Sequence, residues 1–339
     1  MFPEINEETT HGNLGLERFL RALVHTFQPP FVPGNIYVVM NAADEAYVQY
    51  YKDHNRIYED GTEVIQTTLA AAYAAMASNR NDVVLLNGHG THSLAEMLDV
   101  AKNRCHFYGM SDRRRYGHAA RVSIGETSAV TDIAAIKNTG VRNSFKNFKV
   151  MSANTLTEGL FAFAEGGEYT VMEDVELYLS AQLAVAGAAE LLMNGDSFQG
   201  KRITLGSNVD IITANGARPN ILLDRETITG KVCRDVTIED SLFWRKSADV
   251  DNRFVYGSGA TDVERMLLLK DCIFHNTKLA AQTMALAVHT ASEQSMGRIL
   301  LKNCESVGVA GVATQTGIFV DNGAATAGKG GFMIQAVAQ

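Results

Sequence analysis

A short pattern of apolar and polar residues recurs along the second half of the chain. Each copy contains an apolar residue, a charged residue, an Asn or Asp, and a second apolar residue. The clear copies are Phe145-Lys146-Asn147-Phe148, Met172-Glu173-Asp174-Val175, Leu269-Lys270-Asp271-Cys272 and Leu301-Lys302-Asn303-Cys304. Looser copies carry Asn194, Asn220 and Asp240, and the steps between successive Asn or Asp positions are 27, 20, 26, 20, 31 and 32 residues. A repeat at such a period predicts a solenoid of stacked coils.

The Asn and Asp residues of the repeat are predicted to form the corners of the coils. These residues tolerate left-handed backbone geometry and bond to their own backbone, and when stacked they can bond to one another along the solenoid axis. A ladder of calcium ions would instead need several carboxylates in each turn and a Gly-rich nonapeptide pattern, and the sequence has neither. The predicted structural corners are Asn147, Asp174, Asn194, Asn220, Asp240, Asp271 and Asn303.

Two segments near the N-terminus have helical spacing. Residues 14–27 place apolar side chains on one face, followed by a linker that contains Pro29, Pro30 and Pro33. A second, alanine-rich helix is predicted to begin after Thr62 as its N-cap and to run to Met76, where it would cap one end of the stack. The first helix would dock on another protein through Leu16, Phe19, Leu20, Leu23 and Phe27.

Short apolar runs separated by Gly, Ser, Asn and Thr complete the pattern. The predicted fold is all-β, a right-handed parallel β-helix with an N-terminal α-helical arm and a capping helix. The predicted domains are an arm and Pro-rich linker at 1–35, an N-terminal cap with a helix at 36–80, the parallel β-helix at 81–325, and a C-terminal tail or cap strand at 326–339.

A family resemblance rests on residues 60–125. The order Asp-Gly-Thr, alanine-rich helix, Val-Val-Leu-Leu, Gly-x-His, strand and Phe-x-Gly is similar to the N-terminal cap and first turns of the pectate-lyase-like right-handed parallel β-helix superfamily. The repeat extends this likeness to about residue 325. Through region 36–125 the chain also resembles β-helix structural proteins of tailed bacteriophages, namely capsid-decorating proteins, head fibres and tailspikes.

Composition narrows the function classes. The chain of 339 residues has a formal net charge of −8, which argues against nucleic acid as its ligand, because phosphate binding needs a basic face. No apolar run is long enough to cross a bilayer, and the first residues show no secretory signal. We therefore expect synthesis in a host cytoplasm, no membrane insertion and no nucleic-acid partner.

The cysteines and histidines do not indicate a metal site. Cys105, Cys233, Cys272 and Cys304 have no CxxC spacing, so free thiols are expected, with Cys272 and Cys304 stacked in the core. The histidines at 89, 92, 106 and 118 have no fixed relation that would bring three together. No metal and no cofactor are predicted.

Candidate catalytic groups are few. Gly88-His89-Gly90 matches a tripeptide of polygalacturonases, but no preceding coil supplies their acids, so a turn is predicted. Asp174 or Glu176 facing Glu190 or Asp196 would be the carboxylate pair of a glycosidase. Because 38 acidic residues make such coincidences common, no catalytic residue is predicted.

Aromatic residues around Trp244, which include Phe243 and Tyr256, can stack on sugars or anchor a protein interface, and the interface is favoured. The resemblance to phage proteins implies a non-enzymatic structural protein of the virion, a capsid decoration, fibre or spike. It would form a homotrimer and bind a capsid or tail protein through its N-terminal arm. The alternative is a carbohydrate-active β-helix enzyme, a polysaccharide lyase or glycoside hydrolase such as a depolymerising tailspike, with a host-surface glycan as ligand.

Overall fold

The computed structural model describes most of the repeat region. The described residues are 33–40, 61–88, 91–110, 120–125, 133–153, 161–179, 188–211, 219–223, 234–247, 252–257, 266–277, 284–290, 299–311 and 318–321. The predicted arm at 14–27, His89, His118, Cys233 and the C-terminal tail lie outside these residues.

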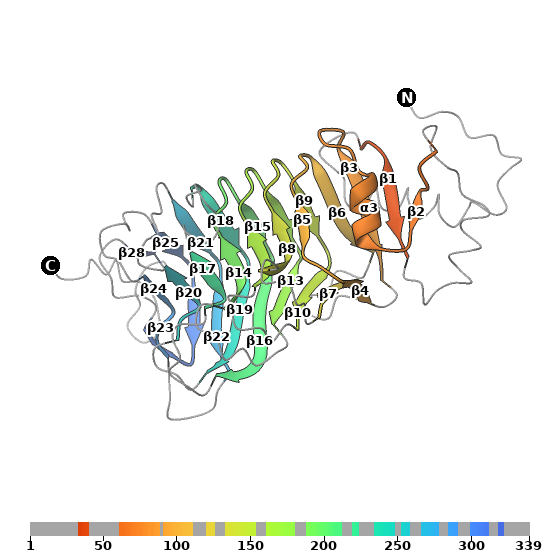
Figure 1. Cartoon of the computed structure of the whole chain (residues 1–339). Coiled ribbons are helices and arrows are strands. Elements are labelled where there is room, and N and C mark those ends of the chain that lie inside the picture. The colour runs from red at the N-terminus through yellow and green to blue at the C-terminus, as the bar shows by residue number, and fades with distance from the viewer. Residues whose placement is uncertain are drawn as a thin grey trace, which may run out of the picture.

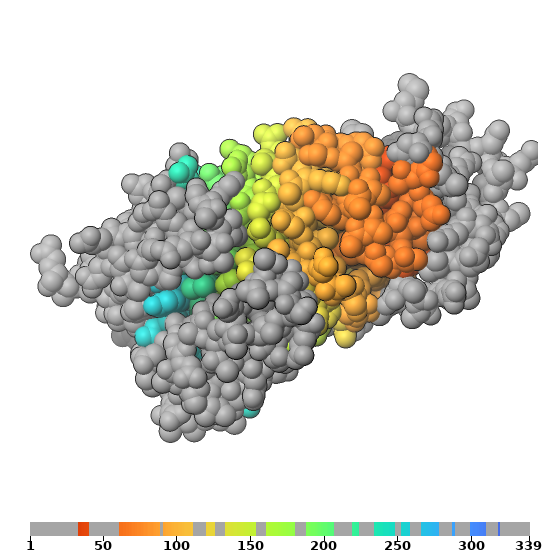
Figure 2. Space-filling model, in the orientation of Figure 1, coloured from red at the N-terminus to blue at the C-terminus, as the bar shows by residue number. Residues whose placement is uncertain are grey.

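The chain is an all-β parallel solenoid with almost no helix, in which successive coils stack along one axis from β1 to β28 (Figure 1). Three long parallel sheets form its sides. In the space-filling view the described coils from orange to green form one continuous surface (Figure 2). The all-β parallel solenoid expected from the repeat is therefore confirmed.

The 11-stranded sheet contains the first strand of each coil. Its strands, in spatial order, are β2 (Ile65–Gln66), β1 (Ile36–Val39), β3 (Asp82–Asn87), β6 (Cys105–Met110), β9 (Ser144–Lys146), β12 (Val171–Glu173), β15 (Gln199–Lys201), β18 (Val236–Glu239), β21 (Leu267–Lys270), β25 (Ile299–Lys302) and β28 (Ile318–Asp321).

The 8-stranded sheet takes the second strand of each coil. Its strands, in chain order, are β4 (Thr91–Leu94), β7 (Arg121–Ile124), β10 (Lys149–Ser152), β13 (Glu176–Leu179), β16 (Thr204–Ile211), β19 (Leu242–Ser247), β22 (Ile273–Asn276) and β26 (Glu305–Val307).

The 7-stranded sheet takes the third strand. Its strands are β5 (Leu98–Val100), β8 (Ala134–Asn138), β11 (Phe161–Glu165), β14 (Ala189–Met193), β17 (Ile221–Leu223), β20 (Val255–Gly257) and β24 (Val288–Thr290). A separate two-stranded sheet pairs β23 (Met284–Leu286) with β27 (Val309–Gly311).

Inward-facing apolar side chains stack between coils, since parallel strands in register place equivalent positions above one another. Phe107 and Phe145 are partners on β6 and β9, and their rings stack at 5.1 Å between centroids. Phe145 then meets the ring of Phe163 edge-on at 4.9 Å. One continuous core cluster extends in this way from Tyr37 to Ile318.

Left-handed corners lie on both sides of the first strand in the coils of β9, β12, β15 and β18, and on one side in other described coils. The corner before that strand has positive φ at Asn81, Arg104, Arg142, Tyr169, Ser197 and Asp235. The corner after it has positive φ at Asn147, Asp174, Arg202, Asp240, Asp271 and Asn303. The spacing of the second set is 27, 28, 38, 31 and 32 residues.

Two of the residues predicted as corners lie elsewhere. Asn194 follows β14 and Asn220 precedes β17, both at the 7-stranded sheet and both buried, and neither has a positive φ. Arg202 occupies the corner between Asp174 and Asp240, with a φ of 51°. Its Nε donates to Asp174 Oδ1 at 2.7 Å, so the guanidinium bonds along the solenoid axis to the corner one coil earlier.

The helix in the N-terminal region is shorter than predicted. Residues 65–66 form β2, paired in parallel with β1, and α3 spans Leu69–Ala75. Its N-cap is Thr68, whose hydroxyl accepts a hydrogen bond from Ala71 N at 3.1 Å, and not Thr62. Leu69, Ala72 and Met76 join the interior core. The role of this helix as a cap stays a prediction.

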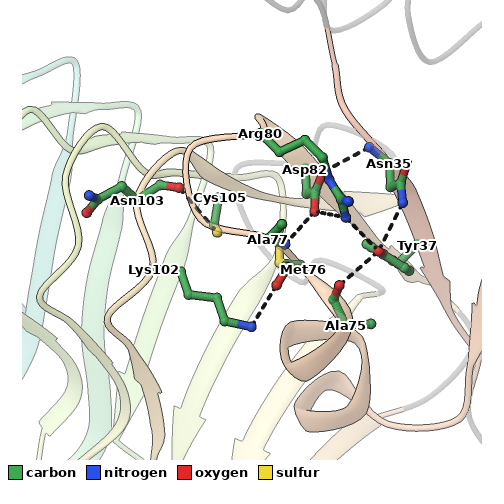
Figure 3. A network of polar contacts seen from close by, with 10 residues as sticks. All are labelled: Asn35, Tyr37, Ala75, Met76, Ala77, Arg80, Asp82, Lys102, Asn103 and Cys105. Carbon is green, nitrogen blue, oxygen red and sulfur yellow. Dashed lines mark hydrogen bonds and ion pairs between the residues drawn. The ribbon is translucent and has the colours of Figure 1, made fainter. Parts of the chain in front are cut away.

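A polar network holds α3 against the first coils (Figure 3). Lys102 Nζ donates to the carbonyls of Tyr73, Ala74 and Met76 at 2.7–2.9 Å, which places a cation at the negative end of the helix. On the other side the buried carboxylate of Asp82 accepts two bonds from Arg80, at 2.6 and 2.7 Å. The Tyr37 hydroxyl accepts from Arg80 Nη2 at 3.0 Å and donates to the Ala75 carbonyl.

The described cysteines, Cys105, Cys272 and Cys304, are buried thiols. Cys272 and Cys304 precede paired strands and stack within the core. Burial raises the pKa of the Cys105 thiol to about 12. No helix among the described residues is both long and apolar enough to cross a membrane.

Candidate functional site

An aromatic row lies on the outer face of the 8-stranded sheet. Parallel pairing places five side-chain positions in line across β10, β13, β16, β19 and β22, which lie side by side in Figure 1. All except Gly206 carry a large, half-buried side chain. We define the aromatic row as Met151, Tyr178, Gly206, Trp244 and His275.

Gly206 is the position that lets the row form. A Cβ atom at Gly206 would collide with the indole ring of Trp244, so the ring lies against the bare backbone of β16. From there it reaches the ring of Tyr178 on β13, with 6.3 Å between centroids and a tilt of 37°. The Trp244 indole N–H has no hydrogen-bond acceptor among the described residues. Two aromatic rings from strands that are not neighbours thus form one apolar platform.

An ion pair fixes the edge of this platform. Lys149 Nζ lies 2.7 Å from Glu176 Oε1 and 4.0 Å from the centroid of the Tyr178 ring. Both charged side chains are largely buried, with exposed fractions of 13% and 7%. The pair cancels its own charge and supports Tyr178, so the row presents aromatic surface beside a neutral polar rim.

The outer face of the 11-stranded sheet differs, because it carries a ladder of charges. The residue before each second corner is charged, and the pairing aligns Lys146, Glu173, Lys201, Glu239, Lys270 and Lys302. Lys146 pairs with Glu173 at 2.9 Å, and Lys270 with Glu239 at 3.3 Å. Burial raises the pKa of Glu173, but the neighbouring Lys146 and Arg202 outweigh it and hold that pKa below its usual value. This face neutralises much of its own charge.

Three of the candidate carboxylates are paired with cations. Glu176 pairs with Lys149 on the 8-stranded sheet, and Asp174 pairs with Arg202 at a corner. Glu190 is fully buried in β14, where its Oε2 lies 2.5 Å from Arg245 Nη2. Burial raises the pKa of Glu190 and lowers that of Arg245. A fully buried, paired carboxylate cannot line a substrate groove, so Glu190 is not placed to act as one half of a glycosidase pair.

The described histidines do not form a metal site. His92 Nε2 lies 2.8 Å from the carbonyl of Asn87, and His106 Nδ1 lies 2.7 Å from Ser144 Oγ. No group of three His, Cys, Asp or Glu residues in the described part of the chain is placed to hold a metal ion. Ser144, which also contacts the Tyr108 hydroxyl at 3.2 Å, is only 6% exposed, so its hydroxyl is not open to a substrate.

The sequence pointed to Trp244 but missed the rest of the row. Of the aromatics grouped with Trp244, Phe243 points into the core and Tyr256 lies on the outer face of the 7-stranded sheet. The missed signal is periodic, because every member of the row lies four residues after a second corner, as Tyr178 follows Asp174 and His275 follows Asp271. The other predicted interface residues, Leu16, Phe19, Leu20, Leu23 and Phe27, lie outside the described residues.

No known family model matches the chain, and no curated protein sequence matches it either. Among solved structures, it is similar to a pectin methylesterase in complex with a hexasaccharide, with 11% identity over 82% of this chain and 91% of that chain, at a TM-score of 0.47. Pectin methylesterase PemA from Erwinia chrysanthemi has 11% identity over 86% and 93% of the two chains, at 0.45. Pectate lyase Pel9A has 13% identity over 86% and 75%, at 0.47. At these scores the likenesses indicate neither a site nor an activity.

Proposed function

We propose that the chain is a carbohydrate-active β-solenoid protein that binds an extended glycan along the aromatic row. The observation that carries this proposal is the pair of rings of Tyr178 and Trp244, joined over Gly206 on the outer face of the 8-stranded sheet. Aromatic rings combine an apolar face with a polar handle, which suits the apolar faces and hydroxyl edges of sugars.

The geometry of the row suits a linear polymer. Adjacent strands lie about 4.8 Å apart, so the row extends by this step along the solenoid axis. A sugar ring in an extended glycan has a comparable length, so one chain can meet several members of the row at once. Several weak stacking contacts along one chain then add up to a useful affinity.

The glycan is proposed to be neutral. The chain carries a formal net charge of −8, which disfavours a polyanionic polymer. Lys149, whose Nζ lies 4.0 Å from the centroid of the Tyr178 ring, is already paired with Glu176. None of the five residues of the aromatic row is a carboxylate, so the row itself supports binding.

Isothermal titration calorimetry against a panel of neutral and acidic oligosaccharides tests the proposal. A neutral oligosaccharide should bind, and Trp244→Ala should weaken its binding about tenfold, which corresponds to about 1.4 kcal/mol. The control Tyr169→Ala removes an exposed ring outside the row and should leave the affinity unchanged. Failure of every neutral glycan to bind, or equal binding by Trp244→Ala, would reject the proposal.

Turnover is measured on the same panel by the release of reducing ends or of unsaturated uronates. Release by the wild-type protein would show that it is a hydrolase or a lyase. Its catalytic groups would then lie outside the aromatic row.

The particle role predicted from the sequence depends on other parts of the chain. A virion protein that forms a homotrimer and docks on a capsid or tail through residues 1–35 would use the arm, of which only residues 33–35 are described. This role stays a prediction. Light scattering of the purified protein measures the trimer, and a monomer at all concentrations would contradict it.

A further inference from the structure

The outer face of the first strands of the 11-stranded sheet is apolar and buried. Strands β2, β1, β3 and β6 lie next to one another at the N-terminal end of the solenoid (Figure 1). Their outward side chains form a second hydrophobic cluster, separate from the interior core, with exposed fractions of 0–6%. We call this cluster the outer apolar face: Val38, Met40, Ile65, Val83, Leu85 and Tyr108, with Ile36 and Met110 at its edge.

Strand β3 is therefore buried on both sides. Val84 and Leu86 point into the interior core, while Val83 and Leu85 belong to the outer apolar face. Helix α3 packs on the interior side, because Leu69, Ala72 and Met76 join the interior cluster. Every described member of the outer apolar face comes from the four strands or the residues next to them.

A single sheet cannot bury its own outer face, since apolar residues must pack against another layer to leave water. Because the described members of this cluster form one layer, the second layer comes from elsewhere. We propose that the apolar stripe of residues 14–27 packs on the outer apolar face of the same chain. The stripe consists of Leu16, Phe19, Leu20, Leu23, Val24 and Phe27.

The place where the chain enters the sheet supports this occupant. Gly34 N donates to the Asn81 carbonyl at 2.9 Å, and Asn35 N donates to Asp82 Oδ1 at 2.9 Å. These bonds fix the start of β1 beside β3, within the sheet that carries the face. The five residues 28–32 can span about 17 Å when extended, which is enough for the preceding segment to turn back onto it.

The dimensions also agree. Four adjacent strands make a face about 14 Å wide, and fourteen helical residues would be about 21 Å long. Such a segment covers all four strands with a single apolar stripe, whereas Arg18 and His25 fall on the opposite side of the helical wheel.

Other segments of the chain suit the face less well. Residues 41–60 link β1 to β2 and contain five acidic residues, and residues 111–119 contain the run Arg113-Arg114-Arg115. Charged side chains are costly against an apolar face, which disfavours both segments.

Polar groups at the margin show that the cover extends past the apolar residues. His106 and Ser144 are 4% and 6% exposed, although their side chains lie on the outer face of the sheet. Burial lowers the pKa of His106 to about 4 and raises that of Tyr108 to about 12.

Thiol labelling of the full-length protein tests the proposal. Val83→Cys introduces a thiol on the outer apolar face, while the native Cys105 in the interior core reports whether the coils stay closed. With Leu20→Glu and Leu23→Glu added, maleimide should label position 83 at least about tenfold faster while Cys105 stays protected. Arg18→Glu is the matched control and should leave both rates unchanged. An unchanged rate at position 83 in the Leu20→Glu, Leu23→Glu protein would overturn the proposal, since residues 41–60 would then provide the cover.

A second measurement decides the case in which both thiols become reactive. In the full-length double variant Leu20→Cys, Val83→Cys, mild oxidation should give an intramolecular disulfide, whereas Arg18→Cys, Val83→Cys should not. A disulfide between two chains would show that a second copy supplies the cover and would overturn the intramolecular proposal, as would the absence of any disulfide at position 20.

Discussion

The indole ring of Trp244 on β19 occupies the space that a side chain at position 206 on β16 would fill. Gly206 is therefore not a weak point in the strand but the condition under which Trp244 can lie against the sheet and meet Tyr178. Glycine in the interior of a strand commonly marks such a close approach. The platform thus depends on the absence of one methyl group.

Gly206→Ala should push the indole ring away from the sheet. We expect an unfolding free energy lower by about 1–2 kcal/mol, because added carbon in a packed site forces its neighbours to move. Trp244 is the only tryptophan, so its emission reports the displacement directly and should shift to longer wavelength. Gly125→Ala is the control, since a Cβ atom there meets nothing within 4 Å. An unchanged emission spectrum in Gly206→Ala would contradict the contact.

His106 should make the stability of the protein depend on pH. Burial, followed by the charge of Lys146, lowers its pKa from 6.5 to about 4 in the folded protein. Between these two pH values His106 is protonated in the unfolded chain but neutral in the folded protein. The free energy of unfolding therefore rises with pH. The contribution is complete above pH 6.5 and is lost as the pH falls to about 4, a change of about 3 kcal/mol at 1.36 kcal/mol per unit.

Chemical denaturation of wild type and His106→Gln at several pH values between about 4 and about 7.5 measures this contribution. The difference between their unfolding free energies should change with a slope of up to about 1.4 kcal/mol per pH unit in this range. Parallel curves for the two proteins would show that His106 titrates with its ordinary pKa.

The coil repeat could be predicted because it follows from short-range rules. Turns select Asn and Asp, and the apolar residue after each turn must return to the core. Two of the predicted corner positions were wrong for a physical reason. Asn194 and Asn220 are buried polar residues at the 7-stranded sheet, while the true corner, Arg202, is held by its bonds to Asp174 of the previous coil. The hydrogen bond between Arg202 and Asp174 thus outweighed the preference of turns for Asn and Asp.

The start of the helix illustrates the same limit. Thr62 and Thr68 are equally good N-caps by sequence, and the apolar spacing continues through Ile65. Ile65 instead pairs with Val38 in the sheet, so tertiary pairing shortens the helix at its beginning. The contact of Trp244 with Gly206 was beyond sequence reasoning, because it joins residues 38 positions apart whose register depends on the corner at Arg202.

Lys102 should stabilise α3 locally. Lys102→Met removes the donor shared by the carbonyls of Tyr73, Ala74 and Met76, and should cost about 1–2 kcal/mol. Hydrogen exchange should accelerate at the amides of Ala72 and Met76, which bond within the helix, and remain slow in β12. Lys137→Met, which breaks a looser 3.5 Å pair with Asp99, should change stability by less than about 0.5 kcal/mol. Equal effects of the two substitutions would contradict the capping role.

The buried pair of Glu190 and Arg245 should cost more to break than to replace. Glu190→Leu leaves a guanidinium in the core without its carboxylate, and we expect a loss of about 3–5 kcal/mol in urea denaturation. Adding Arg245→Met removes that stranded charge, so the double variant should regain most of the loss. The partly exposed Glu173, replaced by Gln as a control, should cost less than about 1 kcal/mol. A double variant less stable than Glu190→Leu alone would contradict this expectation. It would show that Arg245 stabilises the core without Glu190, through its hydrogen bond to the Pro219 carbonyl.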